Sequence, residues 1–274
     1  MHPFVHVFGR TLGSYGIMMV LGALAGALYL WIYCKVRKLD FEPLIDTGLI
    51  AIVGGLAGAF LIRPLMKLPE VIIHWKSVYA LMPAGQFFSY MFGEMVFYGG
   101  LIGGAIAGLI FLRYIKYPRL KAADILICAV PLAHVFGRIG CLLGGCCYGM
   151  EVPAGTFLSV IYPEGAITDV PTGVPVLGVP IIEAIVNAVI FVVLLLFLRR
   201  QKVRGLTFSL YMILYAVQRF MLEFFRGDRV RGIYGGLSTS QIISIILFAL
   251  GVFLMIYLPI RQKRKQARKS ASVA

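Results

Sequence analysis

Charged side chains lie inside apolar stretches of this sequence, where they are costly. His134 and Arg138 are four residues apart, so one helical turn places both on the same face. A guanidinium at membrane depth normally faces a cavity, an ionic partner or an anionic ligand. The segment then runs through Cys141 into a stretch rich in Gly and Cys. This pattern predicts a helix that breaks into irregular backbone lining a buried or wet site.

A second polar stripe lies in the apolar segment 206–225 and just beyond it. Tyr215, Arg219, Glu223 and Arg226 are spaced by four, four and three residues, which predicts one helical face. One interpretation is an Arg219 to Glu223 ion pair that fixes helix packing. The other adds an anionic headgroup, because arginine matches phosphate oxygens with a bidentate fork.

The rest of the sequence must position these residues within a membrane. Of 274 residues, 60% are hydrophobic and 14% are charged, which excludes a soluble globular protein. Apolar stretches long enough to cross a hydrocarbon core of about 30 Å predict an all-α integral membrane protein with about seven transmembrane helices. The predicted ranges are 15–33, 47–62, 95–112, 122–143, 181–198, 206–225 and 237–258.

The basic residues predict the orientation of the chain. The net charge is +14, but Lys and Arg gather in short clusters at alternate helix ends, which argues against a nucleic-acid partner. Four clusters fall on one side of the membrane, so we expect the N-terminus outside and the C-terminus in the cytoplasm. They lie at 35–38, 113–121, 199–204 and 261–269. We expect one polytopic membrane domain at 1–260 and a basic cytoplasmic tail at 261–274.

Glycines recur in the predicted third helix, at Gly100, Gly104 and Gly108. Small residues at four-residue spacing favour close helix packing. The pair Gly99 and Gly100, at the mouth of this helix, also allows a lipid headgroup to approach the backbone.

The cysteines Cys141, Cys146 and Cys147 have several interpretations. A structural zinc site normally needs four ligands, and no fourth Cys or suitably spaced His accompanies them, so no metal is expected. A disulfide between two of them would suit the outer face. Small buried thiols lining a cavity are the favoured interpretation. A covalent relay through one thiol stays open.

Taken in order, these pieces resemble the prolipoprotein diacylglyceryl transferase family of the bacterial cytoplasmic membrane, along most of the chain. The elements Gly-Arg-x-Gly and Arg-x3-Glu-x2-Arg are specific in combination. The matching residues are Tyr15-Gly16, Phe97-Tyr98-Gly99-Gly100-Leu101-Ile102-Gly103, Gly137-Arg138-Ile139-Gly140, Glu183, Arg219-Phe220, Glu223-Phe224-Phe225-Arg226, Gln241-Ile242 and Ser244-Ile245.

The resemblance implies a multi-pass enzyme of the inner membrane. It would move the diacylglyceryl group of phosphatidylglycerol onto the cysteine thiol of a prolipoprotein signal peptide and release glycerol phosphate. No cofactor is expected, and membrane lipid is a partner. The expected catalytic residues are His134, Tyr98, Arg138 and Arg219. The expected substrate-binding residues are Tyr15, Gly99, Gly100, Gly140, Cys141, Gly149, Glu183, Tyr215, Glu223, Arg226 and Gln241.

This sequence differs from the family pattern at several positions that are expected to take part in the reaction. Tyr98 stands where members carry His, and Cys141 stands where they carry Asn. Gly144 and Cys146 replace an Asn and a Glu, and the Gln that usually precedes the glutamate at position 183 is absent. His134 is a candidate replacement for the missing base, or a packing histidine.

Two other function classes compete with this one. A non-catalytic lipid-headgroup-binding or transport protein on the same scaffold would keep the arginines and lose the base, and a transferase with a different acceptor is a related alternative. A retinal protein is disfavoured because the last predicted helix has no lysine to carry a Schiff base.

Overall fold

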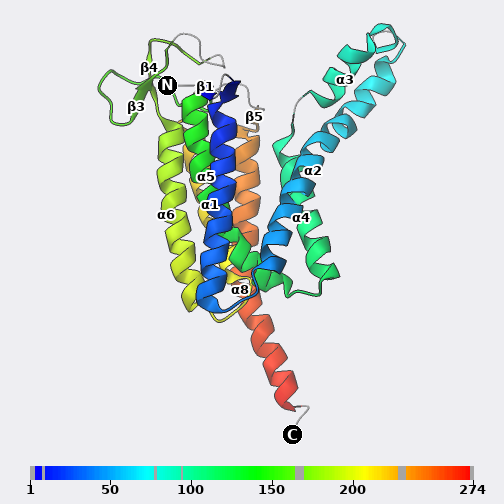
Figure 1. The fold of residues 1–274 in the computed structure, drawn as a ribbon, viewed down its shortest axis with the longest axis vertical. Helices are drawn as coiled ribbons and strands as arrows, with labels where there is room; N and C mark the ends of the chain where they lie inside the picture. The colour runs from blue at the N-terminus through cyan, green and yellow to red at the C-terminus, as the bar shows by residue number, and fades with distance from the viewer. Residues whose placement is uncertain are drawn as a thin grey trace. The chain divides into compact units, whose positions relative to one another are not determined.

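The computed structural model describes residues 4–7, 10–76, 79–93, 95–163, 170–227 and 233–271. The described chain is dominated by helices (Figure 1). They are α1 (Ser14–Arg37), α2 (Glu42–His74), α3 (Ala84–Phe92), α4 (Phe97–Tyr114), α5 (Arg119–Gly144), α6 (Val179–Arg200), α7 (Leu206–Glu223) and α8 (Thr239–Ala271), with a short 3-10 helix, η1, at Tyr79–Leu81. Each of the seven predicted segments falls largely within one of these helices.

Among the described residues, five helices are long and apolar enough to cross a membrane, namely α1, α2, α5, α6 and α8. Helix α4 is apolar but shorter. Helix α7 is less apolar because it carries Gln218, Arg219 and Glu223. The chain is therefore a helical membrane protein, as the composition predicts. The basic segment after residue 260 continues α8 as helix to Ala271.

Three small antiparallel sheets, which the sequence did not predict, lie outside the helices, one before α1 and two in connections between helices. They pair β1 (Phe4–Val7) with β2 (Arg10–Gly13), β3 (Ser159–Ile161) with β4 (Pro175–Leu177), and β5 (Ile233–Tyr234) with β6 (Leu237–Ser238). Val160 lies opposite Val176 in the second sheet. Tyr162, Val170 and Val176 form a small buried cluster beside it. This cluster gives the long connection between α5 and α6 a core of its own.

The chain forms two compact units, residues 1–33 with 123–274 and residues 34–122. In the larger unit, α1 lies against α5 through small residues: a Cβ added at Gly22 would lie 3.1 Å from the Ala133 carbonyl oxygen. Helix α7 packs on both α6 and α8. The close approach of these helices places the side chains of α5, α6, α7 and α8 around a common interior.

The smaller unit is built on the pairing of α2 with α4. A Cβ added at Gly99 would lie 2.5 Å from the Gly58 carbonyl oxygen, and one at Gly104 would lie 2.8 Å from that of Ala51. The two backbones are therefore in contact. Beyond this crossing, α2 continues past Pro64 and Pro69 to His74. Val71, Tyr79 and Met91 pack there in a second core with α3.

Candidate active site

Glu183 is the buried centre of the polar network in the larger unit. It lies in the first turns of α6, and its side chain is 2% exposed. Arg138 of α5 places Nε 2.8 Å from Oε2, and Arg219 of α7 places Nη1 3.9 Å from Oε1. Two arginines from different helices therefore converge on one carboxylate.

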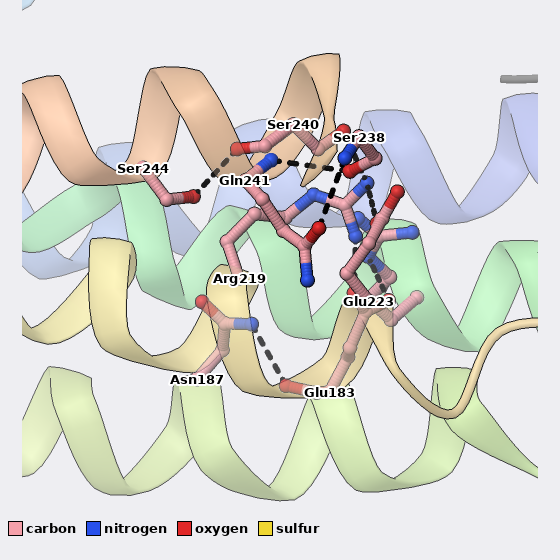
Figure 2. Close-up of polar contacts among 9 residues, drawn as sticks. Glu183, Asn187, Arg219, Glu223, Ser238, Ser240, Gln241 and Ser244 are labelled. Atoms are coloured by element: carbon pink, nitrogen blue, oxygen red, sulfur yellow. Dashed lines mark hydrogen bonds and ion pairs between the residues drawn. The ribbon is translucent and has the colours of Figure 1, made fainter. Parts of the chain in front are cut away.

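Arg219 connects this centre to α8. Its Nη2 lies 2.8 Å from Oε2 of Glu223 one turn later and donates to Oγ of Ser240 over 2.9 Å. Figure 2 shows Arg219 between Glu223 of its own helix and Ser240 of α8. The predicted ion pair between Arg219 and Glu223 is confirmed. It is one part of a network that joins four helices.

His134 lies one turn before Arg138 on α5 and faces α7. Its ring centroid is 5.9 Å from that of Tyr215, which stacks in turn on Tyr211. Asn187 of α6 donates to the Glu183 carbonyl oxygen over 2.7 Å and also interacts with His134. The predicted residues His134, Arg138, Glu183, Tyr215, Arg219 and Glu223 thus come together from three helices.

Arg226 is not on the helical stripe that its spacing predicted. Helix α7 ends at Glu223, and Arg226 forms an antiparallel bridge with Gly149. The helix stops because the backbone pairs here with the connection after α5: Met150 N donates to Phe225 O over 2.9 Å. Arg226 still lies near enough to interact electrostatically with Glu183.

Gly140 and Gly149 are both explained by close packing. A Cβ at Gly140 would lie 3.1 Å from Cδ2 of Tyr15 on α1. One at Gly149 would lie 2.6 Å from the Leu177 carbonyl oxygen. Their predicted contact with substrate stays a prediction, as does that of Tyr15, which is half exposed.

Gln241 caps the start of α8. Its Oε1 accepts a hydrogen bond from Ser238 N over 2.9 Å, and its own N–H donates to Ser238 Oγ over 3.2 Å. This reciprocal arrangement is a capping box, which satisfies two backbone donors of the helix end. The signal Ser-x-x-Gln was present in the sequence and was missed.

Tyr98, Gly99 and Gly100 belong to the smaller unit. Tyr98 is 37% exposed, and Gly99 is buried against α2. The packing interpretation of these glycines is confirmed, while their predicted contact with a headgroup stays a prediction.

The three cysteines of the Gly and Cys segment lie together, with sulfur atoms all within 4.8 Å of one another. Cys141 is buried, and the other two are partly exposed. Hydrogen bonds from Cys141 and Cys146, together with the nearby Arg226 guanidinium, lower the pKa of the Cys147 thiol. The predicted small thiols therefore stand next to the arginines.

Three residues of these networks were not predicted from the sequence, namely Asn187, Ser240 and Asp124. Asn187 is a buried amide one turn after Glu183, and a polar residue in so apolar a helix was a usable signal. Asp124 of α5 accepts hydrogen bonds from Gly205 N (2.5 Å) and Phe208 N (3.0 Å) at the start of α7. It caps that helix from a distant part of the sequence, which no local pattern reveals.

This arrangement is suited to holding a phosphate ester. Arg138 and Arg219 keep 21% and 13% of their side chains exposed while anchored to carboxylates. Guanidinium groups fixed in this way can bind phosphate oxygens and stabilise charge on a departing phosphate.

Comparison with known proteins agrees with this chemistry. The family model described as prolipoprotein diacylglyceryl transferase matches residues 3–257. The chain is 34% identical to phosphatidylglycerol–prolipoprotein diacylglyceryl transferase 2 of Clostridium perfringens, over 90% of this chain and 91% of that protein. It is also 34% identical to the phosphatidylglycerol–prolipoprotein diacylglyceryl transferase of Dehalococcoides mccartyi strain CBDB1, over 91% and 90% respectively. The chain therefore belongs to the prolipoprotein diacylglyceryl transferase family.

Proposed function

We propose that this protein transfers the diacylglyceryl group of phosphatidylglycerol to the lipobox cysteine of a prolipoprotein. The acceptor thiolate attacks the glycerol carbon that carries the phosphate. The carbon–oxygen bond to phosphate breaks, a thioether forms, and glycerol phosphate leaves with the bond electrons. The relatives carry the name of this activity, and the arginine network supplies chemistry that fits it.

The observation that carries the proposal is the convergence of Arg138 and Arg219 on Glu183. A buried ion pair is weak evidence for stability, because apolar residues in its place are often neutral or stabilising. A cluster of two fixed, partly exposed guanidinium groups is therefore better explained by an anionic ligand. In this proposal Arg138 and Arg219 hold the donor phosphate, and Glu183 and Glu223 orient them. Arg226 adds positive charge nearby.

The acceptor thiol must lose its proton, since the thiolate is the nucleophile. We assign His134 as the base, because it lies one turn from Arg138 beside Tyr215. Loss of a general base costs about 10²- to 10⁴-fold in rate. His134→Gln should therefore nearly abolish thioether formation while Tyr98→Phe is milder. The reverse order of effects would assign the base role to Tyr98.

The proposed setting is a bacterial inner membrane crossed by α1, α2, α4, α5, α6, α7 and α8. The N-terminus lies outside, and the basic end of α8 lies in the cytoplasm. The arginine network then stands at the level of the outer leaflet, where a secreted prolipoprotein presents its cysteine. A reporter fused to the C-terminus should be active only in the cytoplasm, and external activity would overturn this orientation.

The test is complementation of bacteria depleted of their own diacylglyceryl transferase, with lipoprotein mobility as the readout. The wild-type chain should restore lipidation, and Arg138→Lys should fail because lysine lacks the planar fork. Arg204→Lys is the matched control, since Arg204 is an exposed arginine in the connection between α6 and α7. Failure of a well-inserted wild-type chain would instead favour a non-catalytic headgroup-binding protein or another acceptor.

A further inference from the structure

The end of α5 brings three thiols to one place by a specific backbone motif. Gly145 has φ 74, and Cys146 N donates to Cys141 O over 3.0 Å. This is the 6→1 bond of a Schellman motif, which brings the residue after the glycine, Cys146, next to Cys141 five positions earlier. Cys147 then has φ 60, so the chain turns back at once. As a result, all three sulfur atoms lie within 4.8 Å of one another.

We propose that Cys141, Cys146 and Cys147 form a trigonal thiolate site for a single soft metal ion, and that the ion it takes is monovalent copper. The proposal does not depend on the lipid transfer, although Arg138 and Arg226 lie next to both sites. Binding replaces the three thiol protons with one metal ion and involves no change of oxidation state.

The spacing of the sulfur atoms suits this assignment. A metal–sulfur bond of about 2.3 Å in a trigonal plane requires sulfur atoms roughly 4 Å apart. The observed limit of 4.8 Å needs side-chain shifts of only a few tenths of an ångström. A disulfide would use two of the three thiols, and the pair adjacent in sequence is geometrically awkward.

The number of ligands selects the ion. Within the part of the chain that the structure describes, no further His, Cys, Asp or Glu joins this group. Structural zinc is almost always four-coordinate, whereas soft thiolate ligands also select monovalent copper, which accepts three. Three thiolates around a monovalent ion carry excess negative charge. Arg226, which interacts with Cys147, and Arg138, which interacts with Cys141 and Cys147, lie where they can offset it.

The experiment is a copper titration of the full-length protein, purified in detergent without oxygen and with a phosphine reductant. Cu(I) is supplied as its bicinchoninate complex, and its transfer to protein is followed by loss of the chelate colour. The variants are Cys141→Ser, Cys146→Ser and Cys147→Ser, each checked for unchanged thermal unfolding. Cys128→Ser is the matched control, because Cys128 is a buried thiol on the same helix that bonds to the Asp124 carbonyl oxygen at 3.6 Å.

Wild type and Cys128→Ser should each take up one equivalent of Cu(I). Cys141→Ser, Cys146→Ser and Cys147→Ser should each bind Cu(I) at least tenfold more weakly than wild type. X-ray absorption should report three sulfur neighbours. A further variant replaces all three cysteines with serine, and wild-type uptake no greater than that of this variant would overturn the site. An equal loss of affinity in Cys128→Ser would also overturn it. Tighter binding of Zn(II) than of Cu(I) would overturn the choice of ion. If two thiols react with a thiol reagent only after reduction, and the reduced protein takes up no copper, the cluster forms a disulfide and not a metal site.

Discussion

Helices α2 and α4 are joined by backbone contact between glycines, whereas α5, α6, α7 and α8 are joined around charged and polar side chains. At the first contact, Gly99 faces Gly58 with no room for a Cβ atom. At the second, the buried Glu183 and the partly exposed Arg219 occupy an interior that apolar residues could fill. Close packing of small residues is sufficient to associate membrane helices. The charged network is therefore better explained by a ligand than by assembly.

Removing the central carboxylate should have the largest effect on stability. Glu183→Ala would leave Arg138 and Arg219 without the buried acceptor that they share. Truncating one partner of a buried ion pair costs about 3–5 kcal/mol, so we expect a large fall in the thermal unfolding temperature in detergent. Glu151→Ala, at an exposed residue of the connection after α5, should leave it unchanged. Equal stability of both variants would mean that water or lipid compensates the network.

A smaller loss is expected at the glycine contact. A Cβ at Gly58 would lie 2.9 Å from Gly103 Cα, and the Gly99 carbonyl oxygen is in its way as well. Overpacking typically costs about 1–3 kcal/mol, so Gly58→Ala should lower the unfolding temperature. The control is Gly48→Ala on the same helix, where no neighbour lies within 4 Å. Alanine favours a helix over glycine by up to about 1 kcal/mol, so this variant should be neutral or slightly stabilised. Similar behaviour of both variants would argue against the backbone contact.

The smallest expected effect concerns the hydrogen bond between Arg219 and Ser240. Ser240→Ala removes an acceptor 2.9 Å from Nη2 of Arg219, which is worth about 1 kcal/mol, or roughly fivefold in kcat/KM for the lipid donor. Ser244→Ala is the control, since that hydroxyl donates to the Ser240 carbonyl oxygen at 2.8 Å. Steady-state kinetics with phosphatidylglycerol would distinguish the two variants. Equal kcat/KM values for both would mean that the Ser240 hydroxyl plays no part in binding the donor.

The sequence predicted the helices well because apolar length is a strong signal. It placed the end of α7 too late, since the turn at Arg226 depends on pairing with Gly149, 77 residues earlier, and not on local composition. It also missed the short strands, which are two to four residues long and too brief to show periodicity.

The candidate site was predicted in part. Spacing along one helix indicated that His134 lies with Arg138, and that Arg219 lies with Glu223. It could not show that Glu183 joins both arginines, because that requires the packing of three helices. The sequence predicted irregular backbone after Cys141 but not the approach of the three thiols, because the Schellman motif that gathers them involves a positive φ at Gly145. A glycine permits such a turn but does not by itself predict it.

The arginine network is proposed to bind the phosphate ester of the lipid donor during catalysis, and turnover by the purified protein tests this role. Phosphatidylglycerol and a lipobox peptide are mixed with wild type or Arg219→Lys, and thioether product and glycerol phosphate are quantified together. Wild type should give equal yields of both products. Arg219→Lys should lose about 10²-fold or more in turnover with an unchanged unfolding temperature. If Arg219→Lys turns over as fast as wild type, the network is only an ion pair that fixes helix packing. If folded wild type forms neither product, the proposed enzymatic activity is contradicted.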